Sequence, residues 1–124
     1  MEEKEIQDVI TEFGKQMGIP DLELDFNDQL QIEVDSGETL HIERADASLL
    51  VYISFEVLPY IVSRTLEKMY VETNYKENNT EPLKIGLYNS NIVVAVHINQ
   101  SKLTTTHLIQ SVDTLWNFKA QIIE

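Results

Sequence analysis

The sequence of 124 residues contains no cysteine, four glycines, three prolines and only nine basic residues. The absence of cysteine excludes disulfide frameworks, cysteine nucleophiles and thiolate metal sites. The sequence also has no glycine-rich phosphate loop and no Gly-x-Ser-x-Gly element, the usual signatures of nucleotide-binding and hydrolase sites. A hydrophobic content of 43% and a charged content of 24% are ordinary for a folded protein, so we expect one domain over residues 1–124.

A long apolar segment is missing as well. The longest apolar stretch, residues 49–58, is interrupted by Ser54 and Glu56 and is too short to cross a bilayer. Three of the first five residues are glutamates, whereas a secretory signal begins with basic residues. These features predict a cytoplasmic protein without membrane insertion.

The spacing of the polar residues does not indicate a metal site or a catalytic site. His41, His97 and His107 form no His-x-His or His-x-x-x-His pair, the spacing that zinc sites favour. The acidic run of residues 21–27 lacks the glycine and the final glutamate of a calcium loop. Alternating carboxylates on an edge strand explain that run better. We therefore expect no metal, no cofactor and no enzymatic activity.

Acidic charge is the main excess. The chain has 21 acidic residues and a net charge of −12. Residues 1–62 hold fifteen acidic and three basic residues, and residues 63–124 hold six of each. A one-sided negative field repels nucleic acid and attracts a basic or amphipathic polypeptide. Acidity that serves solubility alone is the simpler interpretation.

Hydrophobic periodicity predicts three helices. They cover residues 3–17, residues 59–75, and a C-terminal segment capped by one of three threonines, Thr104 to Thr106. The middle helix is apolar on more than one side, as in helices that are buried from two directions. A second copy of the chain would supply one of these directions.

Alternating apolar residues predict five strands. The predicted strands are residues 29–35, 39–44, 49–57, 83–87 and 92–98, with Gly37 supplying a positive φ in the first hairpin turn. The order α-β-β-β-α-β-β-α predicts an α+β fold in which helices pack on a twisted antiparallel sheet.

Two strands carry apolar residues on the face that we expect to be wet. Leu50 and Tyr52 share that face with Ser54 and Glu56, and Val93 lies on the corresponding face of its strand. Exposed apolar residues on a sheet indicate a binding surface; coverage by a helix is the alternative for each residue. An extended, partly basic chain would fit such a surface and add a strand to an open sheet edge.

The element order, the opening helix that ends in Phe13-Gly14-Lys15-Gln16-Met17-Gly18-Ile19, and the meander of residues 22–43 resemble the class I type III secretion chaperones (the Tir-chaperone, or CesT-like, family). The resemblance implies a cytoplasmic homodimer that binds the N-terminal chaperone-binding segment of one or a few secreted effectors. It implies that the segment stays extended, soluble and competent for export.

The resemblance also implies site residues. The family dimerises through the middle helix and the following strand, which here correspond to Val62, Leu66, Met69, Tyr70, Leu83, Ile85 and Leu87. Its effector-binding patches, on the first helix and the sheet, correspond to Phe13, Leu24, Leu50, Tyr52 and Val93.

Two other functions remain open. A small acidic regulatory or interaction domain of the same fold, not linked to secretion, fits the pattern because a fold alone does not assign a function. A mimic of nucleic acid that blocks a DNA-binding protein fits the negative charge. An adjacent gene for a secreted protein would favour the chaperone.

Overall fold

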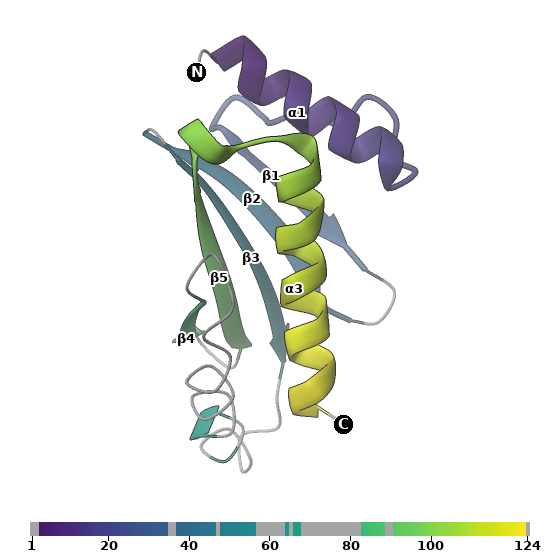
Figure 1. Ribbon diagram of the computed structural model, residues 1–124. Coiled ribbons are helices and arrows are strands. Elements are labelled where there is room, and N and C mark those ends of the chain that lie inside the picture. The colour runs from purple at the N-terminus through teal and green to yellow at the C-terminus, as the bar shows by residue number, and fades with distance from the viewer. Residues whose placement is uncertain are drawn as a thin grey trace.

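The computed structural model describes residues 3–34, 37–46, 48–56, 64, 66–67, 83–88 and 91–123. Within these ranges the chain forms two long helices, one short 3-10 helix and five strands (Figure 1). In chain order they are α1 (Glu3–Gln16), β1 (Gln29–Glu33), β2 (Thr39–Ala45), β3 (Ser48–Glu56), β4 (Lys84–Tyr88), β5 (Asn91–Asn99), η2 (Gln100–Lys102) and α3 (Thr105–Ile123).

The five strands form one antiparallel sheet in the order β1-β2-β3-β5-β4. The first three strands form the predicted meander, and β5 pairs with β3 so that β4 lies at the far edge. In the middle of the sheet, Val51 lies opposite Ile42 on one side and Val96 on the other. The α+β fold with an antiparallel sheet is confirmed, and β1 and β4 are its two edges.

One face of the sheet is covered by both long helices. α3 lies along the sheet against β3 and β5, and α1 crosses near one end of α3 (Figure 1). Alternate residues of β3 and β5 point into this layer and are buried, as their period-2 patterns predict. From α1, the side chains of Ile6, Ile10 and Phe13 complete the core. We refer to this side of the sheet as the covered face and to the other side as the open face.

The start of α3 confirms the predicted threonine cap and selects one of the three candidates. The Thr104 hydroxyl accepts a hydrogen bond from the backbone N–H of His107 at 3.0 Å. This bond satisfies one of the N–H groups that a helix leaves unpaired at its start.

Residues 22–26 do not form the predicted edge strand. Polar side chains of α1 bind their backbone instead: the Leu22 carbonyl accepts from Gln7 Nε2 and Thr11 Oγ1, both at 3.2 Å, and the Leu24 N–H donates to Gln7 Oε1 at 3.2 Å. Because α1 takes these backbone groups, the segment runs along the helix, and the edge strand of the sheet is β1.

The predicted middle helix is described at three of its positions. Arg64, Leu66 and Glu67 have helical backbone conformation, and Leu66 is half-buried against the core. The other positions of residues 59–75 lie outside the described residues, among them Val62, Met69 and Tyr70.

Candidate functional site

The open face carries three of the five residues that the resemblance assigned to effector binding. Leu50, Tyr52 and Val93 are half-buried there. Leu24 is half-buried against the core beside α1. Phe13 is fully buried, with 0% of its surface exposed. The expectation that places Phe13 on a binding surface is therefore wrong for this fold, because the side chain points from α1 into the core.

An aromatic pair lies at the centre of the open face. The rings of His41 and Tyr52, which are cross-strand neighbours on β2 and β3, stack with centroids 4.4 Å apart and planes 8° from parallel. His41 Nε2 also lies 3.1 Å from Ser54 Oγ, within hydrogen-bonding distance. These contacts fix both rings, so the open face presents a preformed surface rather than loose side chains.

Partial burial changes the pKa of both rings. Burial lowers the pKa of His41 below its usual value of 6.5, and the nearby Glu43 carboxylate opposes this effect. Burial raises the pKa of the Tyr52 hydroxyl, and the charge of Glu43 and a hydrogen bond with it act in the same direction. Both rings are therefore held in their neutral forms at neutral pH, which suits contact with an apolar or hydrogen-bonding partner.

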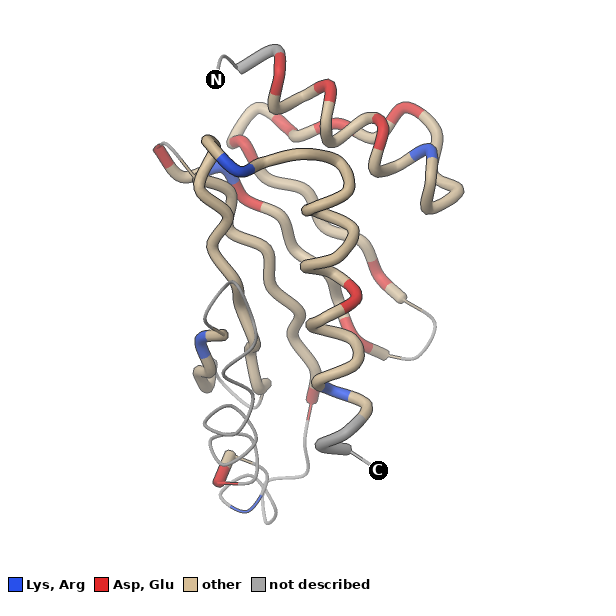
Figure 2. Tube along the Cα trace, viewed as in Figure 1, with Lys and Arg blue, Asp and Glu red and all other residues tan. Residues whose placement is uncertain are grey.

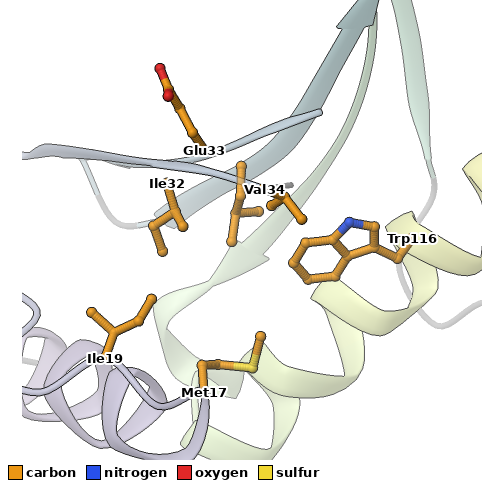
Figure 3. A pocket seen from close by; sticks show the side chains of 7 residues that line it. Met17, Ile19, Ile32, Glu33, Val34 and Trp116 are labelled. Atoms are coloured by element: carbon orange, nitrogen blue, oxygen red, sulfur yellow. The ribbon is translucent and has the colours of Figure 1, made fainter. Parts of the chain in front are cut away.

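A groove lies on the covered-face side of the sheet, between the end of α1, the end of β1 and α3. It encloses about 260 Å³. Figure 3 shows Met17 and Ile19 on one side, Ile32 and Val34 on the other, and the Trp116 indole reaching in from α3. Leu40 and Glu33 complete the lining, and the side chain of Glu33 points away from the groove (Figure 3). The side chains that face the groove are therefore apolar, which suits an apolar ligand group.

The motif at the end of α1 builds one wall of this groove. Gly18 takes a φ of +83°, and the Ile19 N–H bonds to the Gly14 carbonyl at 2.7 Å, so the helix ends in a Schellman turn. A Cβ on Gly14 would lie 2.6 Å from the Ile19 carbonyl oxygen and 2.6 Å from Leu22 Cβ. Glycine at this position therefore lets the chain turn closely enough to place Ile19 in the groove.

An open sheet edge runs beside the groove. The Asp28 carbonyl and the Val34 N–H bond toward β2 and the loop that precedes it. Because backbone groups alternate in direction along an antiparallel strand, those of Gln31 and Glu33 point to the outer edge. β1 pairs with β2 alone among the described strands, and both residues are exposed. An extended peptide can bond to this edge while placing a side chain in the groove.

Charge is distributed unevenly over this surface. Acidic residues recur along α1, along the segment that follows it, and on β1 and β2, where few basic residues lie (Figure 2). The surroundings of the groove therefore have a negative potential, which favours a basic or amphipathic ligand.

The residues that the resemblance assigned to dimerisation fall into three groups. Leu83 is buried, and Ile85 is half-buried on β4. Leu87, also on β4, is 52% exposed. Leu66 packs partly on the core, as described above, and the remaining members lie outside the described residues. The exposed position of Leu87 on an edge strand leaves an apolar side chain available to a partner.

Sequence patterns did not reveal the groove. Met17 lies in the predicted helix of residues 3–17, Val34 in the predicted strand of residues 29–35, and Trp116 in the predicted C-terminal helix. Their meeting depends on tertiary packing. The signal that could have pointed to it is Gly18-Ile19, where an apolar residue directly follows a helix-ending glycine.

The described part of the chain contains neither a candidate metal site nor a helix that could span a membrane. Its His, Asp and Glu side chains form no group of three that could hold a metal ion. None of its helices combines the length and apolar character that a bilayer crossing needs.

Solved structures with the same fold include chaperone complexes. A chain of the HopA1–SchA chaperone–effector complex has a TM-score of 0.74 and 15% identity, with 94% of this chain and 91% of that chain covered. The Yersinia pestis type III secretion chaperone SycH, solved with a stable fragment of YscM2, has a TM-score of 0.69 and 13% identity over 94% and 98% of the two chains.

The fold is not confined to proteins described in this way. E. coli YbjN, described as a putative transcription regulator, has a TM-score of 0.63 and 14% identity over 94% and 87% of the two chains. At such identities these likenesses show the fold alone.

No individual curated protein matches the sequence at a significant level. A family model does: the one for the type III secretory system chaperone SycN matches residues 5–123. Because the match spans nearly the whole chain, the protein belongs to the SycN family of type III secretory system chaperones.

Proposed function

We propose that this chaperone binds the N-terminal chaperone-binding segment of a secreted effector and keeps it extended, soluble and competent for export in the bacterial cytoplasm. The observation that carries the proposal is the apolar groove beside the outer edge of β1. Backbone bonds to Gln31 and Glu33 would hold the segment extended, and an apolar side chain would fill the groove. Membership of the family and the chaperone–effector complex of the same fold support this proposal.

The open face provides a second contact in the same proposal. An unfolded segment loses conformational entropy on binding, so it must cover a large area to bind tightly. A segment that passes from the groove around the outer edge of β1 onto the open face would cover Leu50, Tyr52 and Val93, which are half-buried there. Leu24, half-buried beside α1, is the fourth residue of this proposed contact.

Co-purification tests the proposal. The chaperone is co-expressed with the N-terminal segments of secreted proteins from its own bacterium, and the segment that is retained is identified. We expect Met17→Glu, which places a charge in the groove, to abolish retention. Phe26→Glu is the matched control, because Phe26 is 95% exposed and lies before β1, at the end away from the groove. Equal retention by both variants would contradict the groove as the binding site.

We further propose a homodimer that forms through the middle helix and β4. Leu87, 52% exposed on the edge strand, supports a contact there, since an apolar residue on a free edge invites pairing. We expect the wild type to sediment as a dimer at micromolar concentration and Leu87→Asp to shift it toward the monomer, because a dimer contact would bury the carboxylate. A monomeric wild type would refute the dimer without affecting the groove.

The fold of YbjN favours one second candidate, an interaction domain that is not linked to secretion. This function predicts that a protein that is not exported co-purifies in place of an effector. The co-purification experiment therefore distinguishes the two functions by the identity of the retained protein.

A further inference from the structure

A buried carboxylate connects the two sides of the groove. Glu38 directly precedes β2 and is 3% exposed. An ionised carboxylate in an apolar layer is costly unless charged and hydrogen-bonded partners compensate for its desolvation. Glu38 has both kinds of partner, and they come from α3, about eighty residues further along the chain.

Each carboxylate oxygen of Glu38 has its own donor. Trp116 Nε1 donates to Oε1 at 2.6 Å, and Lys119 Nζ donates to Oε2 at 2.6 Å. Trp116 and Lys119 are three residues apart, so they lie on the same side of α3. The Lys119 ammonium also lies 5.4 Å from the centre of the Phe55 ring, which gives it a second favourable contact.

The N–H group and the ring of the Trp116 indole make different contacts. Its N–H is held by Glu38, while the ring lines the groove with Met17 and Ile19 opposite (Figure 3). A second link reaches the other wall, because the backbone carbonyl of Glu38 accepts from the Val34 N–H at 3.0 Å. Glu38 is thus bonded to Val34 through its backbone and to Trp116 through its side chain.

We propose that Glu38 is a positioning residue for ligand binding, which fixes Trp116 as a rigid wall of the groove and so sets its width for one large aliphatic side chain. This inference rests on the proposed function of the groove. A wall held in place before binding loses little rotamer entropy when the ligand arrives. An indole without its acceptor would rotate among rotamers, and each encounter would have to order it again.

The variants of Glu38 and Lys119 separate positioning from fold stability. Glu38→Gln keeps an oxygen that accepts from the indole N–H but removes the ion pair with Lys119. Lys119→Met also removes the ion pair, and it keeps the carboxylate and its bond to the indole. Glu38→Ala removes the acceptor itself. Of the three variants, only Glu38→Ala removes the group that holds the indole N–H of Trp116.

The neutral apolar dye N-phenyl-1-naphthylamine is a suitable probe, since the negative charge of the protein does not repel it. Binding is followed by dye fluorescence, and the melting temperature of each variant is measured in parallel. Trp116 is the only tryptophan in the chain, so acrylamide quenching of its emission reports directly on the mobility and exposure of the wall.

We expect Glu38→Ala to weaken dye binding by about two- to tenfold, the cost of ordering one freed side chain on binding, and to increase acrylamide quenching. Glu38→Gln and Lys119→Met should stay within about twofold of the wild-type affinity, although their melting temperatures fall. Should Glu38→Ala fail to fold, Trp116→Phe removes the N–H while keeping an aromatic ring, and we expect the same weakening of dye binding.

Three results would overturn the inference. They are a wild type that does not bind the dye, an unchanged affinity in folded Glu38→Ala or Trp116→Phe, and affinities that follow the melting temperature in all variants. The dye measurement does not depend on co-purification. If the dye results are as expected while no secreted protein is retained, the positioning of the wall stands and the proposed function fails.

Discussion

The two faces of the sheet can be compared on a single strand. Along β3, Val51 and Ile53 point to the covered face and are 0% exposed, while Leu50 and Tyr52 point to the open face and are half-buried. The open face also carries Glu43 and the stacked ring of His41, so it mixes apolar and polar groups. The covered face therefore supplies the folding free energy, and the open face can vary with the partner at little cost to stability.

The largest difference between the faces should appear when adjacent residues of β3 are truncated. Ile53→Ala should lower the free energy of unfolding by about 3 kcal/mol, because it leaves a cavity in the core. Tyr52→Ala should lower it by about 1 kcal/mol, the scale of a cross-strand pair, while weakening retention of the effector segment. Denaturant titrations measure both values, and equal losses would remove the distinction between the faces.

Two glycine replacements compare a crowded backbone position at the end of α1 with an open position on the edge strand β4. Gly14→Ala should destabilise the fold by about 2 kcal/mol, since the new Cβ would meet a backbone oxygen that is fixed by the Schellman turn. Gly86→Ala is the matched control: Gly86 lies on exposed β4 and a Cβ there meets nothing within 4 Å. A stable Gly14→Ala variant would show that the turn can move away from α1, and thermal unfolding detects this.

Charge on the exposed surfaces should affect association more than stability. Glu33 and Glu43 lie on the open face, and the chain has a net charge of −12. We expect the association rate of the co-purified segment to fall about tenfold as salt rises from about 0.05 to 0.5 M, because the field is screened. Stopped-flow mixing measures the rate. A rate that does not depend on salt would show that the acidic residues do not steer the ligand.

The smallest effect concerns His41 on the open face. Its pKa is lowered by burial, so above pH 6.5 the ring is neutral in both the folded and the unfolded chain. As the pH falls below 6.5, the unfolded chain binds the proton first, and the free energy of unfolding decreases. His41→Gln should remove this part of the decrease between pH 7 and 5. Denaturant titrations at both pH values measure it, and an unchanged slope would show that the ring is solvated like a free histidine.

Much of the fold followed from short-range patterns. The period of two located all five strands, and the predicted positive φ of Gly37 is confirmed at +98°. Residues 22–26 also alternate, yet they form no strand, since Gln7 and Thr11 of α1 bind the backbone of Leu22 and Leu24. A pattern within one segment does not show which side chains from elsewhere compete for its backbone groups.

The candidate site was less predictable for a related reason. The open-face residues on β3 and β5 were identified because a strand fixes which side chains share a face. Phe13 was assigned to a binding surface by resemblance, which carries no information on the direction of a side chain. The groove and Glu38 depend on contacts between the first meander and α3, and a carboxylate before a strand normally indicates a solvated turn.

The bonds from Glu38 to Trp116 and Lys119 join residues 78 and 81 positions apart. α3 leaves the ribosome after all five strands, so a growing chain has one wall of the groove long before it has the other. The groove therefore forms only after α3 has been synthesised and has packed against the sheet. Under the proposed function, a nascent chain that lacks α3 has no groove in which to hold a client.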